Sequence, residues 1–206
     1  MRDLPLAEVA PAPGTITTVA VLLTGDGGWV DVDKALARGL AAHGVAVLAL
    51  NSRRYLSHRR TPDVAAADVA RVARSALARW GEHPLVLVGY SRGADLLPFI
   101  VRRLPADLQA RIQLVAMLGL STTANFGFHW TDLVRNKHRP SDLLVLPELG
   151  ALHDVRLLCV YGTEEADSGC RAADSTRVVR VARPGGHHFD RDYRALADLV
   201  AHAATP

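Results

Sequence analysis

The 206-residue chain has few aromatic residues, only two cysteines and no long hydrophobic run. A membrane-spanning helix needs about 18 to 20 consecutive apolar residues, and no stretch of this sequence approaches that length. The first 14 residues are rich in proline and carry both charges, so they lack the basic start and apolar stretch of a signal peptide. We therefore expect either a cytoplasmic protein or a mature form whose leader has been removed.

Lysine is also scarce, because Lys34 and Lys137 are the only lysines among 24 basic residues. The arginines give a formal net charge of +3, but they are spread along the whole chain. A nucleic-acid surface would gather them on one face, so we expect no nucleic-acid partner. One short segment does concentrate them: Arg53, Arg54, Arg59 and Arg60.

What the sequence does contain is a regular alternation of apolar runs and helical patterns. Nearly continuous apolar runs predict strands buried on both faces of a parallel sheet. Six such runs are present: Thr17–Leu23, Ala46–Leu50, Leu85–Val88, Ile112–Leu118, Val155–Tyr161 and Arg177–Ala182. We find no linker or repeat, so one domain is expected over residues 1–206.

Helical patterns lie between most of these runs. Thr61 and Pro62 form a typical helix start, with an N-cap threonine and proline in the first turn. The segments Asp33–His43 and Asp192–Ala203 also read as helices. Strands alternating with helices predict a three-layer α/β domain, with a mostly parallel central sheet of about six strands and helices on both faces.

The most informative motif follows the run Leu85–Val88, where Gly89-Tyr90-Ser91-Arg92-Gly93 leads into a helical pattern. A G-x-S-x-G sequence between a buried strand and a helix is typical of the nucleophile turn of an α/β hydrolase. The tight turn lifts the Ser91 hydroxyl clear of the sheet, and the N–H of Arg92 can stabilise an oxyanion there. We therefore predict an α/β-hydrolase fold with Ser91 as nucleophile.

A serine hydroxyl needs a histidine that removes its proton. In this fold the histidine follows the serine and the acid along the chain, and only His187 and His188 lie between a late strand and the last helix. We prefer His188, because the adjacent Phe189 can hold its ring, and keep His187 as the alternative.

The acid that orients the histidine should follow the strand that ends at Gly162. The loop after it holds three carboxylates, Glu164, Glu165 and Asp167. Repulsion makes it unfavourable for all three to point inward. Asp167 is our first choice, because it is short and lies near Cys170, and Glu165 is the second.

A second oxyanion donor is expected from the loop after the first central strand, Thr24-Gly25-Asp26-Gly27-Gly28-Trp29. Its glycines allow the main chain to approach a substrate closely. Either Asp26 or Gly27 can supply the N–H. A dinucleotide-binding loop is disfavoured, because the G-x-G-x-x-G spacing is missing.

The least regular stretch, Ser121–Leu152, contains Phe126, Phe128 and Trp130. A long aromatic loop in such a domain is usually functional, and we interpret it as a lid or a substrate wall. The alternative is that these rings pack on the sheet edge.

These pieces together resemble the bacterial VirJ proteins and the homologous C-terminal domain of AcvB. The resemblance spans nearly the whole chain, and its most specific parts are G-D-G-G-W and G-G-H-H-F. The matching residues are Leu4-Pro5-Leu6, Gly25 to Trp29, Arg54-Tyr55, Arg60-Thr61-Pro62, Gly89-Tyr90-Ser91, Gly93-Ala94-Asp95, Leu97-Pro98, Tyr161-Gly162, Glu165, Asp167, Cys170, Pro184 to Phe189 and Asp192-Tyr193. Arg92 departs from the pattern, because an apolar residue is expected after the nucleophile.

The resemblance implies an exported, periplasmic hydrolase that cleaves the aminoacyl ester of aminoacylated phosphatidylglycerol, typically lysyl-phosphatidylglycerol, with no metal or organic cofactor. A monomer in peripheral contact with the membrane surface is expected. The substrate phosphodiester suits arginine, its ammonium groups suit Asp26, Glu164 or Glu165, and its acyl chains need an apolar wall. The candidate substrate-binding residues are Arg53, Arg54, Tyr55, Arg60, Phe126, Phe128 and Trp130.

Cys159 and Cys170 flank the acidic loop. Their spacing alone fits two buried thiols as well as a disulfide, whereas the periplasmic location that the resemblance implies favours the disulfide. Two alternative functions stay open: a general carboxylesterase or thioesterase, cytoplasmic in that case, and a non-catalytic binding protein that engages secretion or envelope partners.

Overall fold

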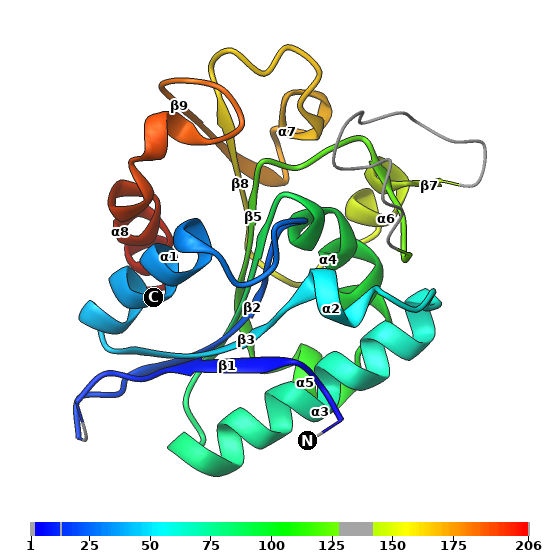
Figure 1. Cartoon of the computed structure of the whole chain (residues 1–206). Helices are drawn as coiled ribbons and strands as arrows, with labels where there is room; N and C mark the ends of the chain where they lie inside the picture. Colours follow the sequence, from blue (N-terminus) through cyan, green and yellow to red (C-terminus); the bar gives the residue numbers. More distant parts are fainter. Residues whose placement is uncertain (1–2, 13, 128–141, 206) are drawn as a thin grey trace.

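A seven-stranded sheet forms the centre of the computed structural model, which describes residues 3–12, 14–127 and 142–205 (Figure 1). Its order is β1-β3-β2-β4-β5-β8-β9, and only β1 is antiparallel to its neighbour. The strands are β1 (Leu6–Val9), β2 (Thr18–Leu23), β3 (Val45–Leu50), β4 (Leu85–Tyr90), β5 (Ile112–Leu118), β8 (Leu157–Gly162) and β9 (Val178–Arg183). Every residue of β2, β3 and β4 is buried, as expected of central parallel strands.

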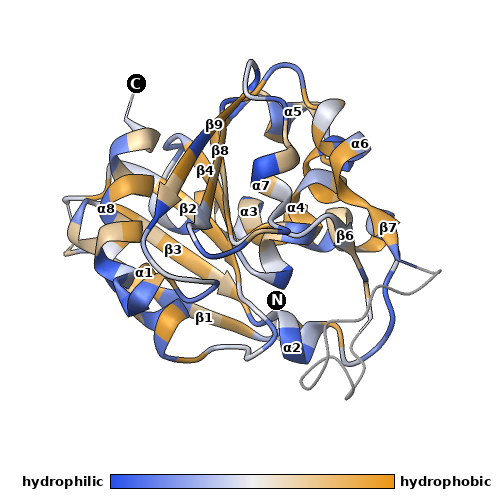
Figure 2. Cartoon of the chain, turned by 90° about the horizontal axis from the view of Figure 1, so that it is seen from above, coloured by the Kyte–Doolittle hydropathy of each residue, from blue (hydrophilic) through white to orange (hydrophobic). Residues whose placement is uncertain are grey.

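Helices cover both faces of the sheet, as the view from above shows (Figure 2). The helices α1 (Asp31–Ala42) and α8 (Tyr193–Ala204) pack on one face, and α3 (Pro62–Trp80) and α4 (Arg92–Arg103) on the other. The short elements are α2 (Ser52–Tyr55), α5 (Ala106–Gln109), α6 (Val145–Gly150), α7 (Gly169–Ala172), the 3₁₀ helix η2 (Phe189–Arg191) and the paired strands β6 (Thr123–Ala124) and β7 (Leu143–Leu144). No helix within the described ranges has the length and apolar character that crossing a membrane requires.

The predicted three-layer α/β-hydrolase fold is confirmed, with seven strands in the sheet where about six were expected. The additional strand, β1, escapes prediction because it is a four-residue edge strand that is only partly buried and includes the exposed Glu8. The helix predicted to begin at Thr61 and Pro62 is α3, and the Thr61 hydroxyl accepts a hydrogen bond from the Val64 N–H at 3.2 Å.

The parallel strands bring their carboxyl ends to one edge of the sheet. The loops after β2, β4, β5, β8 and β9 therefore meet there, although they are far apart in the sequence. In open α/β sheets this edge is where ligands bind.

Candidate active site

Ser91 lies in the sharp turn between β4 and α4 and has a positive φ of 53°. A residue other than glycine in such a conformation costs of order 1–3 kcal/mol, and such strain is concentrated at functional sites. The turn is fixed by the Ser91 N–H, which donates to the Leu118 carbonyl at 2.8 Å. A side chain at Gly93 would collide with the carbonyl of Leu23, so this position of the turn requires glycine.

The ring of His187 lies against the Ser91 hydroxyl. Its Nε2 is 2.7 Å from Ser91 Oγ, and its Nδ1 is 2.6 Å from Oε1 of Glu165. Nδ1–H therefore donates to the carboxylate, and Nε2 is left to accept the serine proton. The ring fits because Gly119 has no side chain, since a Cβ there would lie 2.7 Å from Cε1 of His187. The three residues form the serine–histidine–acid arrangement of nucleophilic catalysis.

Two sequence-based choices are thereby corrected. His188 is exposed, and its Nδ1 lies 2.9 Å from the Tyr90 hydroxyl instead of near Ser91. The reason is Phe189, which is buried in the core and turns the loop so that the preceding His187 faces the serine. Asp167 is exposed near the end of its loop, whereas the longer Glu165 side chain reaches the histidine.

Glu165 is held in place from several sides. Its second oxygen accepts the Gly162 N–H at 2.7 Å, and its carbonyl accepts from Arg171 Nε at 2.8 Å. Burial favours a higher pKa for Glu165, but the hydrogen bonds from His187 and the Gly162 N–H outweigh it and lower the pKa. The hydrogen bond to Glu165 raises the pKa of His187 against the opposing effect of burial. The ring therefore binds the serine proton more tightly than an isolated imidazole would.

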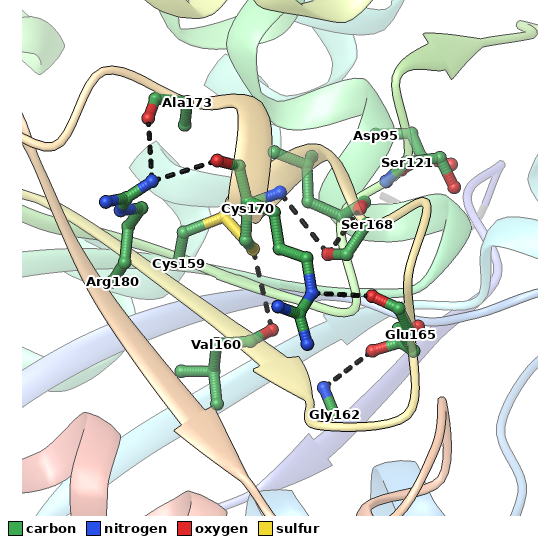
Figure 3. Close-up of a disulfide and its surroundings, with 12 residues drawn as sticks. Asp95, Ser121, Cys159, Val160, Gly162, Glu165, Ser168, Cys170, Ala173 and Arg180 are labelled. Atoms are coloured by element: carbon green, nitrogen blue, oxygen red, sulfur yellow. Dashed lines mark hydrogen bonds between the residues drawn. A yellow bond between two sulfur atoms is a disulfide. The ribbon is translucent and has the colours of Figure 1, made fainter.

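A disulfide joins Cys159 of β8 to Cys170 of α7, behind the loop that carries Glu165 (Figure 3). Their Cα atoms are 5.5 Å apart, and both side chains are fully buried. The bridge that the family resemblance favoured is therefore present. The disulfide anchors the end of the loop that carries Glu165, hereafter the acid loop, to β8, the strand that precedes this loop.

The loop after β2 lies beside Ser91, since a Cβ at Gly25 would be 3.3 Å from that of Ser91. The buried Asp33 carboxylate fixes this loop by accepting the N–H groups of Gly25 and Val30, at 3.4 and 3.3 Å. Within the described residues the N–H groups of Asp26 and Gly27 donate no hydrogen bond. Both therefore remain candidates for the second oxyanion donor, beside the N–H of Arg92.

The Arg92 side chain does not act as an open cation beside the nucleophile. It is buried and forms an ion pair with Asp26, and its Nη1 donates to the Asn125 carbonyl at 3.1 Å. Arg92 thus joins the loop after β2 to the segment that follows β5. Its effect on the site is to hold these two segments together.

The sequence model of the family described as "Bacterial virulence protein (VirJ)" matches residues 17–205. The chain belongs to this family. Comparison with curated protein sequences gives no significant match.

Solved structures similar to this VirJ-family chain share its fold at low sequence identity. An esterase domain of a Rhodothermus marinus protein has a TM-score of 0.66 and 15% identity, over 96% of this chain and 90% of that one. The thioesterase domain from the curacin biosynthetic pathway has a TM-score of 0.64 and 17% identity, over 95% and 94%. A serine hydrolase without a lid, from Xanthomonas campestris, has a TM-score of 0.59 and 17% identity, over 98% and 90%.

The VirJ-family chain gathers its predicted phosphate-binding residues in one pocket of about 780 Å³, beside α2. Arg53, Arg54, Tyr55 and Arg60 line it together with residues of the N-terminal segment. The Arg60 guanidinium lies 5.0 Å from the centre of the Tyr55 ring. The helix α2 beside this pocket contacts the start of the loop after β2, because the Thr24 hydroxyl accepts the Ser52 N–H at 2.9 Å.

The predicted aromatic wall is only partly described. Phe126 is 5% exposed and packs edge-to-face on Phe99, so it belongs to the core and is not an open acyl-binding surface. This corrects its assignment to substrate binding, and the alternative of packing at the sheet edge holds for it. Phe128 and Trp130 lie outside the described residues.

Three further residues at the site were not assigned roles from the sequence. The Tyr90 hydroxyl donates to the His187 carbonyl at 3.3 Å and thereby steadies the histidine loop. Asp33 and Asp95 are buried or partly buried carboxyls whose surroundings raise their pKa values. The signal for Asp33 was its place three residues after the helix N-cap, where an acidic side chain can accept backbone N–H groups. No group of three or more metal-binding side chains occurs in the part of the chain that the structure describes.

Proposed function

We propose that this chain is a serine hydrolase that cleaves the ester between an amino acid and the headgroup of phosphatidylglycerol. The observation that carries the proposal is the continuous hydrogen-bond path from Ser91 through His187 to Glu165, at 2.7 and 2.6 Å. A path of this kind activates a serine hydroxyl for attack on a carbonyl carbon.

In the proposed reaction Ser91 Oγ attacks the aminoacyl carbonyl while His187 takes the hydroxyl proton. Glu165 keeps the ring oriented and stabilises the imidazolium that forms. The N–H of Arg92 and one N–H from Asp26 or Gly27 receive the oxyanion. His187 then gives its proton to the departing headgroup alcohol, and water releases the amino acid from Ser91 with the same histidine as base.

The substrate class is supported by the resemblance to VirJ and AcvB and by the pocket beside α2. Guanidinium groups bind phosphate oxygens through paired hydrogen bonds, and Arg53, Arg54 and Arg60 line this pocket beside α2, the helix that contacts the loop after β2. A lipid headgroup would thus have its phosphodiester at the arginines and its ester at Ser91. A general carboxylesterase would have no use for the arginines.

We also propose that the protein acts in the periplasm as a monomer in peripheral contact with the membrane surface. The disulfide supports an oxidising compartment, because such bridges are rare in the cytosol. The exposed Leu143 and Leu144 of β7 support contact with lipid, and the net positive charge suits an anionic bilayer.

The test is hydrolysis of lysyl-phosphatidylglycerol in vesicles, with short acyl esters as comparison. Ser91→Ala should remain folded, should lose fluorophosphonate labelling and should slow ester cleavage by about 10⁴-fold or more. Retained turnover in Ser91→Ala would exclude the nucleophile. Faster cleavage of short acyl esters than of the aminoacyl lipid would favour a general esterase instead.

A further inference from the structure

The Asp95 carboxyl lies one helical turn beyond the nucleophile and has no part in the proposed reaction. Its backbone N–H donates to the Ser91 carbonyl at 3.1 Å, so the two residues occupy the same end of α4. Its Oδ1 accepts the Ser121 N–H at 2.8 Å (Figure 3). Within the described residues nothing donates to its Oδ2, and the residue is partly exposed. One oxygen is therefore anchored, and the other is available for a further hydrogen bond.

The geometry of the helix directs this carboxyl toward the reacting ester. Side chains on an α-helix tilt toward its N-terminus, which for α4 is the end that carries Ser91. One turn of helix rises about 5.4 Å. His187 is near enough to Asp95 for their charges to interact.

The other carboxylates considered for binding the substrate ammonium are already engaged or exposed. Asp26 forms an ion pair with Arg92, and Glu165 is bound by His187 and the Gly162 N–H. Glu164 is exposed on the loop after β8.

Asp95 differs from them because no cationic side chain of the described residues forms a hydrogen bond with it. Burial raises its pKa to about 8, although the Ser121 N–H and the charges of Arg92 and His187 act in the opposite direction. The charges of Arg92 and His187 thus offset only part of the effect of burial, and neither side chain forms a hydrogen bond with the carboxyl.

We propose that Asp95 binds the α-ammonium group of the aminoacyl ester, an inference that rests on the proposed function. The ammonium nitrogen is three covalent bonds from the oxygen of Ser91 in the acyl-enzyme, a span that suits a carboxyl one turn away. The ligand restores a positive partner to a partly buried acid, and such charged hydrogen bonds are the stronger ones. The site thereby distinguishes aminoacyl esters from plain acyl esters.

The experiment compares two lipids that differ only in the ammonium group: alanyl-phosphatidylglycerol and propionyl-phosphatidylglycerol, each diluted in phosphatidylcholine vesicles. Wild-type protein should prefer the alanyl lipid in kcat/KM. Asp95→Asn keeps the side-chain size and should lower this preference by about 10- to 100-fold. The matched control is Asp107→Asn, which removes an equal charge from an exposed side chain beyond the other end of α4 and should retain the preference.

The outcomes separate this inference from the proposed function. If wild-type protein cleaves neither lipid, the proposed function fails. If it cleaves both equally, or if Asp95→Asn keeps the full preference, the function stands and the ammonium assignment is wrong. If Asp95→Asn slows both lipids by the same factor, the carboxyl is structural, and the assignment is wrong as well.

Discussion

Asp33 offers a test of how the loop after β2, the expected source of an oxyanion donor, is held in place. Its carboxylate is fully buried. Asp33 lies in the first turn of α1, and its carboxylate accepts the N–H groups of Gly25 and Val30. Burial raises its pKa from 3.8 to about 6, even though these N–H groups favour the charged form. The folded protein thus carries a carboxylate that would be more stable in water.

The magnitude follows from the two pKa values. The interval from 3.8 to about 6 corresponds to about 3 kcal/mol. Well below pH 3.8 the group is protonated in both states and has no effect on the free energy of unfolding. Between pH 4 and pH 6 the unfolded chain ionises first, so stability falls as pH rises. Above pH 6 the full cost is present, because the ionised group is buried only in the folded state.

Asp33→Asn removes this titration, so the stability of the variant relative to wild type should rise by about 2.5 kcal/mol between pH 4 and pH 7. The lost acceptor oxygen adds a cost of about 1 kcal/mol that does not depend on pH. Urea unfolding of both proteins at pH 4, 5, 6 and 7 measures the difference. The same variant should be less active, since the loop that supplies an oxyanion donor is held less firmly.

A stability difference that stays constant from pH 4 to pH 7 would refute the reasoning, since it would mean that Asp33 titrates alike in both states. Asp31→Asn is the control for net charge, because Asp31 is on the same helix but fully exposed. It should not reproduce the pH-dependent gain.

Two further predictions concern the acid loop. Glu165→Gln should lower kcat by about 10³- to 10⁴-fold. It should also move the acid limb of the pH–rate profile to lower pH, because the hydrogen bond that raises the pKa of His187 is lost. An acid limb at the same pH as in wild type would contradict this. Replacing Cys159 and Cys170 together by alanine should lower the free energy of unfolding by about 3 kcal/mol, from the entropy of an 11-residue separation. Unfolding of wild-type protein in dithiothreitol should show the same loss, and unchanged stability after confirmed reduction would exclude it.

The fold could be predicted from the sequence because its determinants are local. Six of the seven strands show as apolar runs, and the turn at Ser91 shows as glycines spaced around a serine between a strand and a helix. The edge strand β1 could not be predicted in this way, because its four residues include the charged, exposed Glu8 and give no continuous apolar run.

The choice between neighbouring candidates could not be made from the sequence. His187 and His188 are adjacent, so which ring faces Ser91 depends on where Phe189 is buried and on the space above Gly119. Glu165 and Asp167 differ in reach, and that difference matters only once the distance to His187 is set by the fold. The partner of Arg92 was equally hidden, because Asp26 lies 66 positions away in the chain.

The segment Gly119–Ser121, directly after β5, connects the parts of the site. Gly119 makes room for the His187 ring, and the Ser121 N–H anchors Asp95. Between them, the Leu120 carbonyl accepts the N–H of Gly169 at 2.7 Å and the hydroxyl of Ser168 at 3.3 Å, and these two donor residues directly precede Cys170 in the chain. A side chain at Gly169 would collide with the Ser121 carbonyl, so the segment Gly119–Ser121 and the start of α7 are closely packed against each other. The disulfide therefore stabilises more than the acid loop: through Leu120 and Ser121 it fixes the position of the carboxyl that we assign to the substrate ammonium.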